Sequence, residues 1–292
     1  MTSCLVAVMG RGVVADGEPV ITPDDLGFSR GDGCFDSARV LTDDQGSARV
    51  VNLVEHLDRL ERSAAALGID FPERSRWSEL VDEALAQWDT PGDAVLKFYL
   101  TRGREWQPEA GPLALLTIRE KPATRPRPSQ AGEIPRALHA VTLTTGRPSD
   151  AFADAPWLLG GVKTLSYVTN VAAAREAARR GADDAILVTT DGYALEGPTS
   201  GLVVVSDDVM RTAPTGDTGI LASVTVDEVL RGAQADGMET RVELVPAADL
   251  FSADGVFLVS SGRGPCPVVE LDGKPLQVDA DLAARVARAA GF

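Results

Sequence analysis

The sequence of 292 residues is 44% hydrophobic and 24% charged, which is ordinary for a globular protein of one large or two average domains. Its formal charge of −15 argues against general nucleic-acid binding, which requires a basic surface. Cys4, Cys34 and Cys266 are too few and too scattered for a disulfide framework or a metal site. No apolar run is long enough for a signal peptide or a membrane span, so we expect a cytoplasmic protein that binds no membrane.

The first half of the chain is predicted to mix strands and helices. Apolar runs and alternating patterns predict strands at residues 5–9, 34–41, 48–51, 95–100 and 113–118. A helix is predicted to follow Asn52, which with Glu55 has the spacing of a capping box, and to stop at Gly68. A second amphipathic helix is predicted at residues 77–88.

The first predicted helix has a distinctive polar edge. Its buried stripe consists of leucines and an alanine at helical spacing, and His56, Arg59 and Ser63 lie beside that stripe at positions i, i+3 and i+7. Residues at this spacing are neighbours on a helix surface. We therefore expect these three polar side chains to share one edge.

A proline-rich segment divides the chain. Prolines at positions 122, 126 and 128 are incompatible with a helix or a central strand and indicate a stiff linker. We therefore expect a smaller N-terminal α/β domain at residues 1–120, a linker at 121–132, and a larger C-terminal α/β domain at 133–292 that carries Lys163.

In the second half, strands are predicted at residues 137–144, 185–189, 202–205 and 256–259. Helices are predicted at residues 168–180 and 279–290, and a further helix is predicted to start at Thr225, which forms a capping-box pattern with Glu228.

Lys163 lies within the apolar run 158–165. Desolvation disfavours the ammonium form of a lysine, and a neutral lysine is a nucleophile that forms Schiff bases with carbonyl compounds or with pyridoxal phosphate. The alternative is a lysine at a strand end, with a buried stem and a solvated amine.

Other residues could supply what pyridoxal phosphate requires. Glu196 could keep the pyridine nitrogen protonated, although a glutamate at a turn is usually just exposed. Residues 221–225 lead into a predicted helix, whose N-terminus could bind a phosphate, unless Thr225 only caps that helix. Arg59 and Ser261 could add donors to the phosphate.

Four motifs resemble those of class IV aminotransferases, the fold-type IV group of pyridoxal-phosphate enzymes: residues 55–60, 161–165, 192–197 and 219–225 occur in the order and spacing of that family. The resemblance implies an α/β (α+β two-domain) fold like that of D-amino acid aminotransferases, and a homodimer whose partner subunit completes the active site. It implies that Lys163 is the Schiff-base lysine, that Glu196 partners the pyridine nitrogen and that Tyr167 lies near the phenolic oxygen of the cofactor. The implied phosphate-binding residues are Arg59, Val224, Thr225 and Ser261.

Within the family, residues 31–35 and 37–40 are similar to the corresponding segment of aminodeoxychorismate lyase. Residues 101–103 resemble a segment that supplies an arginine for the substrate carboxylate in the lyase and in D-amino acid enzymes. Ser166-Tyr167 stands where branched-chain enzymes carry asparagine and tyrosine. Asp36-Ser37, Gly201 and Val226 depart from the lyase pattern and leave the substrate open.

We therefore predict a 4-amino-4-deoxychorismate lyase that forms p-aminobenzoate and pyruvate for folate synthesis. Lys163 would act as the general base, and Arg102, Arg30 and Asp36 are the predicted substrate contacts. The alternative is a class IV aminotransferase acting on D-amino acids, branched-chain amino acids or other amines. A third hypothesis, a protein that keeps the fold and binds without catalysis, is disfavoured by the presence of Lys163, Glu196 and Arg59.

Overall fold

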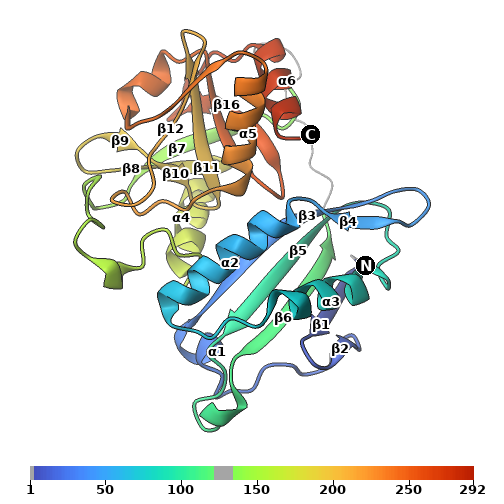
Figure 1. Cartoon of the computed structure of the whole chain (residues 1–292). Coiled ribbons are helices and arrows are strands. Elements are labelled where there is room, and N and C mark those ends of the chain that lie inside the picture. Colours follow the sequence, from blue (N-terminus) through green and yellow to red (C-terminus); the bar gives the residue numbers. More distant parts are fainter. Residues whose placement is uncertain (1–2, 122–133) are drawn as a thin grey trace. The chain divides into compact units, whose positions relative to one another are not determined.

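The computed structural model describes residues 3–121 and 134–292, so the predicted linker lies outside the described residues from position 122 onward. The chain divides into two compact units (Figure 1). Unit 1 comprises Met1–Ala123 with Val162–Tyr167, and unit 2 comprises Thr124–Gly161 with Val168–Phe292. We expected the C-terminal domain to carry Lys163, whereas its segment groups with unit 1, because its backbone pairs with strand β3 (Gly33–Thr42).

Unit 1 is built on a six-stranded sheet with the order β2-β1-β6-β5-β3-β4, in which every neighbouring pair is antiparallel. Its longest pairing joins β3 to β5 along the whole of both strands. The helices α2 and α3 lie across one face of this sheet in Figure 1. Besides β3, unit 1 contains the elements β1 (Cys4–Val8), β2 (Gly12–Val14), α1 (Leu26–Arg30), β4 (Ala48–Val50), α2 (Leu53–Leu67), α3 (Arg74–Leu85), β5 (Gly92–Thr101) and β6 (Leu113–Glu120).

The core of unit 1 lies between the two helices and the sheet. Leu57, Leu60 and Ala64 of α2 are buried there, which confirms the central part of the predicted stripe. Trp77 of α3 is fully buried and meets Phe98 of β5 edge to face, with ring centroids 5.5 Å apart. This arrangement is a favourable geometry for an aromatic pair, and it fixes α3 on the sheet.

Unit 2 contains a larger sheet with the order β13-β12-β11-β15-β16-β7-β8-β9-β14 and two short side strands, β10 on β11 and β17 on β16. It mixes parallel pairs, such as β7 with β8, and antiparallel pairs, such as β11 with β15. The strands are β7 (Leu138–Thr144), β8 (Asp184–Val188), β9 (Tyr193–Ala194), β10 (Glu196–Gly197), β11 (Ser200–Ser206), β12 (Val209–Thr212), β13 (Glu239–Val242), β14 (Val245–Pro246), β15 (Gly255–Ser260), β16 (Gly264–Leu271) and β17 (Lys274–Pro275), and the helices are α4 (Val168–Arg179), α5 (Val224–Ala235) and α6 (Ala280–Ala289).

The central strands of unit 2 are buried on both faces. Alternation along a strand sends successive side chains to opposite sides, so Leu202 and Leu258 join one apolar cluster while Val203 and Phe257 join another. The second cluster is covered by α5 and α6. These helices approach closely at Gly232, where an added Cβ would lie 2.7 Å from the Cα of Ala289.

The structure confirms that α2 begins directly after Asn52, but it changes the predicted capping contacts of α2 and α5. Asn52 adopts a left-handed conformation (φ 53°) without a side-chain cap bond, so the predicted capping box before α2 is absent. The cap of α5 lies two residues before the predicted one, because the hydroxyl of Ser223, rather than that of Thr225, accepts the capping bond from Val226 N–H. Thr225 is therefore available for another contact.

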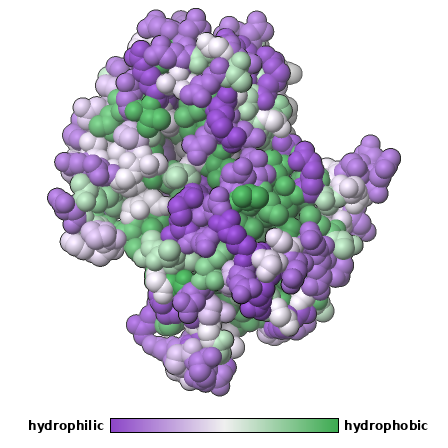
Figure 2. All heavy atoms as spheres, viewed as in Figure 1, coloured by the Kyte–Doolittle hydropathy of each residue, from purple (hydrophilic) through white to green (hydrophobic). Residues whose placement is uncertain are grey.

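Polar residues cover most of the face shown in Figure 2, with apolar residues in smaller patches. This surface agrees with the large net charge of the sequence. None of the helices in the described parts of the chain has the length and hydrophobicity that a membrane-spanning helix requires.

Candidate active site

The segment that carries Lys163 is attached to β3 by its backbone. Phe35 N–H donates to the carbonyl of Lys163 (3.0 Å), and Leu165 N–H donates to the carbonyl of Gly33 (2.8 Å). Between these bonds, Cys34 and Thr164 form an isolated antiparallel bridge. The lysine is thus held by sheet hydrogen bonds, which position its side chain more firmly than a loop would.

Two glycines allow this attachment. A Cβ added to Gly31 would lie 2.2 Å from Ser166 Oγ, and one added to Gly33 would lie 2.7 Å from Leu165 Cδ1. Gly31 also has φ 72°, in the left-handed region that favours glycine. The segment resembling that of aminodeoxychorismate lyase therefore has a structural role: it lets the lysine segment approach β3.

The amine of Lys163 lies against two aromatic rings. Its Nζ is 4.6 Å from the ring centroid of Phe35 and 5.5 Å from that of Tyr167. The two rings meet edge to face, with centroids 5.1 Å apart. Aromatic faces attract a cation and exclude water from its side. Phe35 is a site residue that the sequence did not predict; alternation along β3 places its side chain opposite that of Asp36.

The predicted polar edge of α2 is confirmed. His56, Arg59 and Ser63 are all buried on this helix. Ser63 Oγ accepts a hydrogen bond from Lys163 N–H (3.3 Å), while His56 and Arg59 both contact Asp36 of β3. One helix edge therefore contacts both the lysine segment and the strand beside it.

Asp36 forms a buried cluster with Arg59 and His56. Its Oδ2 accepts from Arg59 Nε (2.7 Å), and its Oδ1 accepts from Arg59 Nη2 (2.8 Å) and from the N–H of Ser37 (2.7 Å), with His56 Nδ1 at 2.7 Å. Burial alone would raise the pKa of Asp36, but the charge of Arg59 and the hydrogen bonds from Arg59 and His56 outweigh it and lower the pKa well below its usual range. Asp36 is therefore an anion, and His56 Nδ1 carries the proton of their contact.

The cluster corrects our assignment of Asp36 as a substrate contact. The residue is 0% exposed, because β3 alternation turns its side chain toward α2 and Arg59 neutralises it there. A side chain in this position cannot contact a substrate. The sequence lacked the signal for this, since the pairing of β3 with α2 is a contact between distant parts of the chain.

Arg102 is engaged with the end of α2. Its Nε and Nη2 donate to the carboxylate of Asp32 (2.6 and 3.2 Å), Nη1 donates to Gly68 O (2.9 Å), and Nη2 donates to Leu67 O (2.7 Å). The last carbonyls of a helix need such donors. In this structure Arg102 therefore connects β5, the loop after α1 and the C-terminus of α2, and its substrate role stays a prediction.

The other predicted substrate arginine, Arg30, lies at the surface. Its guanidinium forms an ion pair with Glu105 (2.8 Å), with side chains that are 65% and 45% exposed. An exposed pair of this kind contributes little to stability, so Arg30 could exchange this partner for another carboxylate at small cost. Its substrate role also stays a prediction.

Arg102→Ala should lower the free energy of unfolding by about 1–2 kcal/mol, because two helix-end carbonyls and one carboxylate lose a charged donor that is partly screened by solvent. Arg30→Ala is the matched control and should change it by less than about 0.5 kcal/mol. Urea unfolding followed by circular dichroism measures both. Equal effects of the two substitutions would show that Arg102 has no such structural role.

In unit 2, three of the predicted phosphate residues lie together at the start of α5. Val224 and Thr225 occupy its first two positions and are buried. The hydroxyls of Thr225 and Ser261 are 2.8 Å apart. Val226 N–H donates to Ser223 Oγ, so the donors that this helix start offers to an anion are its other N–H groups and the hydroxyl pair, which are of a kind that binds anions.

Glu196 lies beside the same segment. It is half-buried in β10, which pairs with β11, and its Oε2 accepts a long hydrogen bond from Leu221 N–H (3.4 Å). Leu221 lies just before the cap of α5, so one short segment connects the carboxylate of Glu196 to the helix start that is predicted to bind the phosphate. Unit 2 thus brings Glu196 near the predicted phosphate residues.

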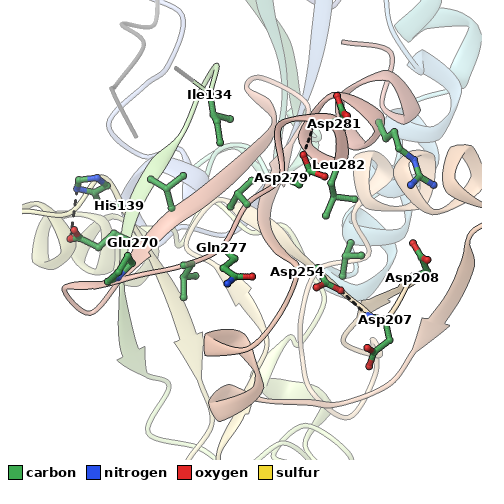
Figure 3. A pocket seen from close by; sticks show the side chains of 16 residues that line it. Ile134, His139, Asp207, Asp208, Asp254, Glu270, Gln277, Asp279, Asp281 and Leu282 are labelled. Atoms are coloured by element: carbon green, nitrogen blue, oxygen red, sulfur yellow. Dashed lines mark hydrogen bonds and ion pairs between the residues drawn. The ribbon is translucent and has the colours of Figure 1, made fainter. Parts of the chain in front are cut away.

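A separate cavity of about 910 Å³ in unit 2 contains none of the predicted site residues (Figure 3). Apolar side chains such as Leu276, Val278 and Leu282 line part of it. It is also lined by six acidic residues: Asp207, Asp208, Asp254, Glu270, Asp279 and Asp281. Several of these already have partners, since Asp254 accepts from Asp207 N–H and Glu270 lies 3.8 Å from His139.

Comparison with known proteins identifies the family. The family model described as "Amino-transferase class IV" matches residues 33–271, which includes the lysine segment, β10 and the start of α5. The chain belongs to the class IV aminotransferase family. The resemblance seen in the four sequence motifs is thereby confirmed, and so is the expected fold-type IV architecture.

Several class IV aminotransferase relatives resemble the whole chain. The bifunctional aminodeoxychorismate lyase / D-amino acid transaminase of Mycobacterium tuberculosis is 34% identical over 93% of this chain and 93% of its own length. A structure described as a hypothetical aminotransferase from M. tuberculosis, in its PLP-bound form, has a TM-score of 0.88 and 32% identity and covers 99% and 98% of the two chains. The fold IV transaminase CpuTA1 from Curtobacterium pusillum has a TM-score of 0.85 and 36% identity, covering 98% and 97%.

Proposed function

We propose that this protein is a pyridoxal-phosphate-dependent 4-amino-4-deoxychorismate lyase that forms p-aminobenzoate and pyruvate for folate synthesis. The observation that carries the proposal is Lys163, fixed to β3 with its amine against Phe35 and Tyr167. Further support comes from the M. tuberculosis relative, whose name includes this activity.

The residues present have the chemistry that the cofactor needs. Lys163 supplies an amine for the aldehyde and Glu196 a carboxylate for the pyridine nitrogen. The start of α5, with the hydroxyls of Thr225 and Ser261, supplies donors for the phosphate. Arg59 is the proposed cationic contact to the phosphate and Tyr167 the proposed contact to the phenolic oxygen. When bound, pyridoxal phosphate supplies an electron sink for the charge left on a carbon that has lost a proton.

The chain's own groups would then move the proton. Lys163 Nζ would take the proton from the carbon that bears the amine of the substrate. The rings of Phe35 and Tyr167 limit water around Nζ and favour one orientation of the side chain. Glu196 keeps the pyridine nitrogen protonated. Loss of pyruvate follows, and formation of the aromatic ring of p-aminobenzoate makes the step favourable.

A second candidate is transamination of D-amino acids. The M. tuberculosis relative carries both activities in its name, and the M. tuberculosis aminotransferase structure is also known in an α-ketoglutarate- and PMP-bound form. The same Lys163 would serve both reactions, because its amine could both take up and return the proton. We also propose a homodimer with the active site near its interface, and a cytoplasmic location.

A paired assay on the cofactor-loaded protein tests the proposal. One arm supplies aminodeoxychorismate and follows p-aminobenzoate and pyruvate, and the other supplies D-alanine with 2-oxoglutarate and follows glutamate. The proposal expects product in the first arm and its loss in Lys163→Ala. Turnover in the second arm alone would replace the lyase by the transaminase, and product in both would show a bifunctional enzyme.

A further inference from the structure

The ion pair between Asp36 and Arg59 has a geometry that fixes the arginine in one plane. The carboxylate meets Nε and Nη2 at 2.7 and 2.8 Å, which is a two-point contact with one edge of the guanidinium. Such paired hydrogen bonds define the direction of both groups. Asp36 is itself held by Ser37 N–H and by His56, each at 2.7 Å.

We propose that Asp36 is a positioning residue for cofactor binding: it fixes the guanidinium of Arg59, the arginine that we assign to the phosphate. This inference rests on the proposed function and adds a role for a residue that contacts neither cofactor nor substrate. His56 contributes by donating to the same carboxylate oxygen. In this chain Asp36-Ser37 stands where the lyase pattern has a pair of threonines, so the carboxylate that orients Arg59 is a departure from that pattern.

The placement of the cluster supports a role at the site. Arg59 lies one helical turn before Ser63, whose Oγ accepts from the N–H of Lys163, and Asp36 follows Phe35, whose ring faces the lysine amine. On β3, Asp36 holds Arg59 and the neighbouring Phe35 contacts the amine of Lys163. On α2, Arg59 and Ser63 lie on successive turns. A change at Asp36 would therefore move Arg59 while Phe35 and Ser63 still hold Lys163.

Stability alone is a weak explanation of the cluster. Burying a charged pair has a desolvation penalty that its attraction often only offsets, and apolar side chains of similar volume commonly do as well or better. Asp36 is 0% and Arg59 is 6% exposed, so the penalty applies to both. What the ion pair provides, and apolar packing does not, is a fixed direction for the guanidinium.

The test compares two ligands of the cofactor-free protein, pyridoxal phosphate and pyridoxal, which share the aldehyde and differ in the phosphate. Their dissociation constants are measured by absorbance titration for the wild type and for Asp36→Asn. We expect Asp36→Asn to weaken pyridoxal phosphate roughly tenfold or more, as loss of an orienting partner does at metal sites, and to leave pyridoxal binding unchanged. Equal weakening of both ligands, or of neither, would overturn the proposal.

Further variants complete the design. Arg59→Lys keeps the charge without the two-point contact and should weaken the binding of pyridoxal phosphate with the same selectivity. The double variant Asp36→Asn/Arg59→Lys should bind pyridoxal phosphate no more weakly than the weaker of the two single variants, because both changes act on one contact. Asp93→Asn, which breaks the Arg39–Asp93 pair between β3 and β5, is the matched control and should change neither constant. If Asp36→Asn does not fold, Asp36→Glu, which displaces the carboxylate, is tested in its place by the ratio of the dissociation constants for pyridoxal and pyridoxal phosphate.

The outcomes separate this inference from the function on which it rests. A wild type that binds neither ligand contradicts the proposed function. A wild type that binds pyridoxal phosphate more tightly than pyridoxal, with the ratio retained in Asp36→Asn and Asp36→Glu, leaves the function in place and rejects the positioning role.

Discussion

Lys163→Ala is expected to lower kcat by about a thousandfold or more in whichever arm of the paired assay the wild type is active. The substitution removes the nucleophile that holds the aldehyde, and it removes the base that takes the proton, a role that by itself contributes about 10²–10⁴-fold. The neighbouring contacts do not replace it, since Phe35 and Tyr167 supply rings and Ser63 supplies a hydroxyl to the backbone.

The matched control for this prediction is Lys97→Ala, an exposed lysine on β5 of the same unit, which should retain wild-type kcat. Steady-state kinetics with saturating cofactor measures both variants, and circular dichroism checks that they are folded. A Lys163→Ala enzyme that keeps a tenth or more of wild-type activity would contradict the assignment of the lysine, because no other group in our account can act as the base.

Arg59→Ala is expected to lower the free energy of unfolding by about 3–5 kcal/mol, since it leaves the carboxylate of Asp36 buried without its cation. This is a large change for a protein whose total stability is of order 10 kcal/mol. The pair is buried on both sides, with side chains that are 7% and 0% exposed, so water cannot easily replace the guanidinium. Urea unfolding of the wild type and variant measures the difference.

Two further variants identify the cause of this loss of stability. Arg39→Ala removes the cation of a more exposed pair, Arg39–Asp93, with side chains that are 13% and 28% exposed, and should cost less than half as much. Adding Asp36→Asn to Arg59→Ala removes the uncompensated charge and should restore at least about 1 kcal/mol. If the double variant is less stable than Arg59→Ala, the loss comes from packing rather than from the buried charge.

Much of the secondary structure could be predicted because its signals are local. The leucine stripe of α2 and its stop at Gly68 follow from helical spacing and from the left-handed conformation that glycine adopts there. The polar edge of α2 follows from the same spacing. The start of α2 was predicted correctly, whereas the cap of α5 was not: Ser223 and Thr225 are both good capping residues, and only the structure shows that Ser223 caps the helix.

The parts that could not be predicted depend on contacts between distant segments. No local pattern shows that residues 162–167 pair with β3, and this pairing is why Lys163 belongs to unit 1 and not to the domain that follows the linker. The same holds for Asp36: alternation puts it opposite Phe35, but only the packing of α2 on β3 shows that Arg59 and His56 enclose it. Arg102 was likewise assigned from a short motif, while the structure engages its donors with Asp32 and the end of α2.

Covalent trapping of the cofactor identifies the lysine that holds pyridoxal phosphate, which we propose to be Lys163. The protein is loaded with the cofactor and reduced with sodium borohydride, which converts a condensation product of amine and aldehyde into a stable secondary amine, and its peptides are mapped by mass spectrometry. Besides Lys163, the chain contains the lysines Lys97, Lys121 and Lys274, so the site is read without ambiguity. Our account predicts one reduced cofactor on the peptide that carries Lys163; a label on another lysine, or none on a protein shown to bind the cofactor, would contradict it.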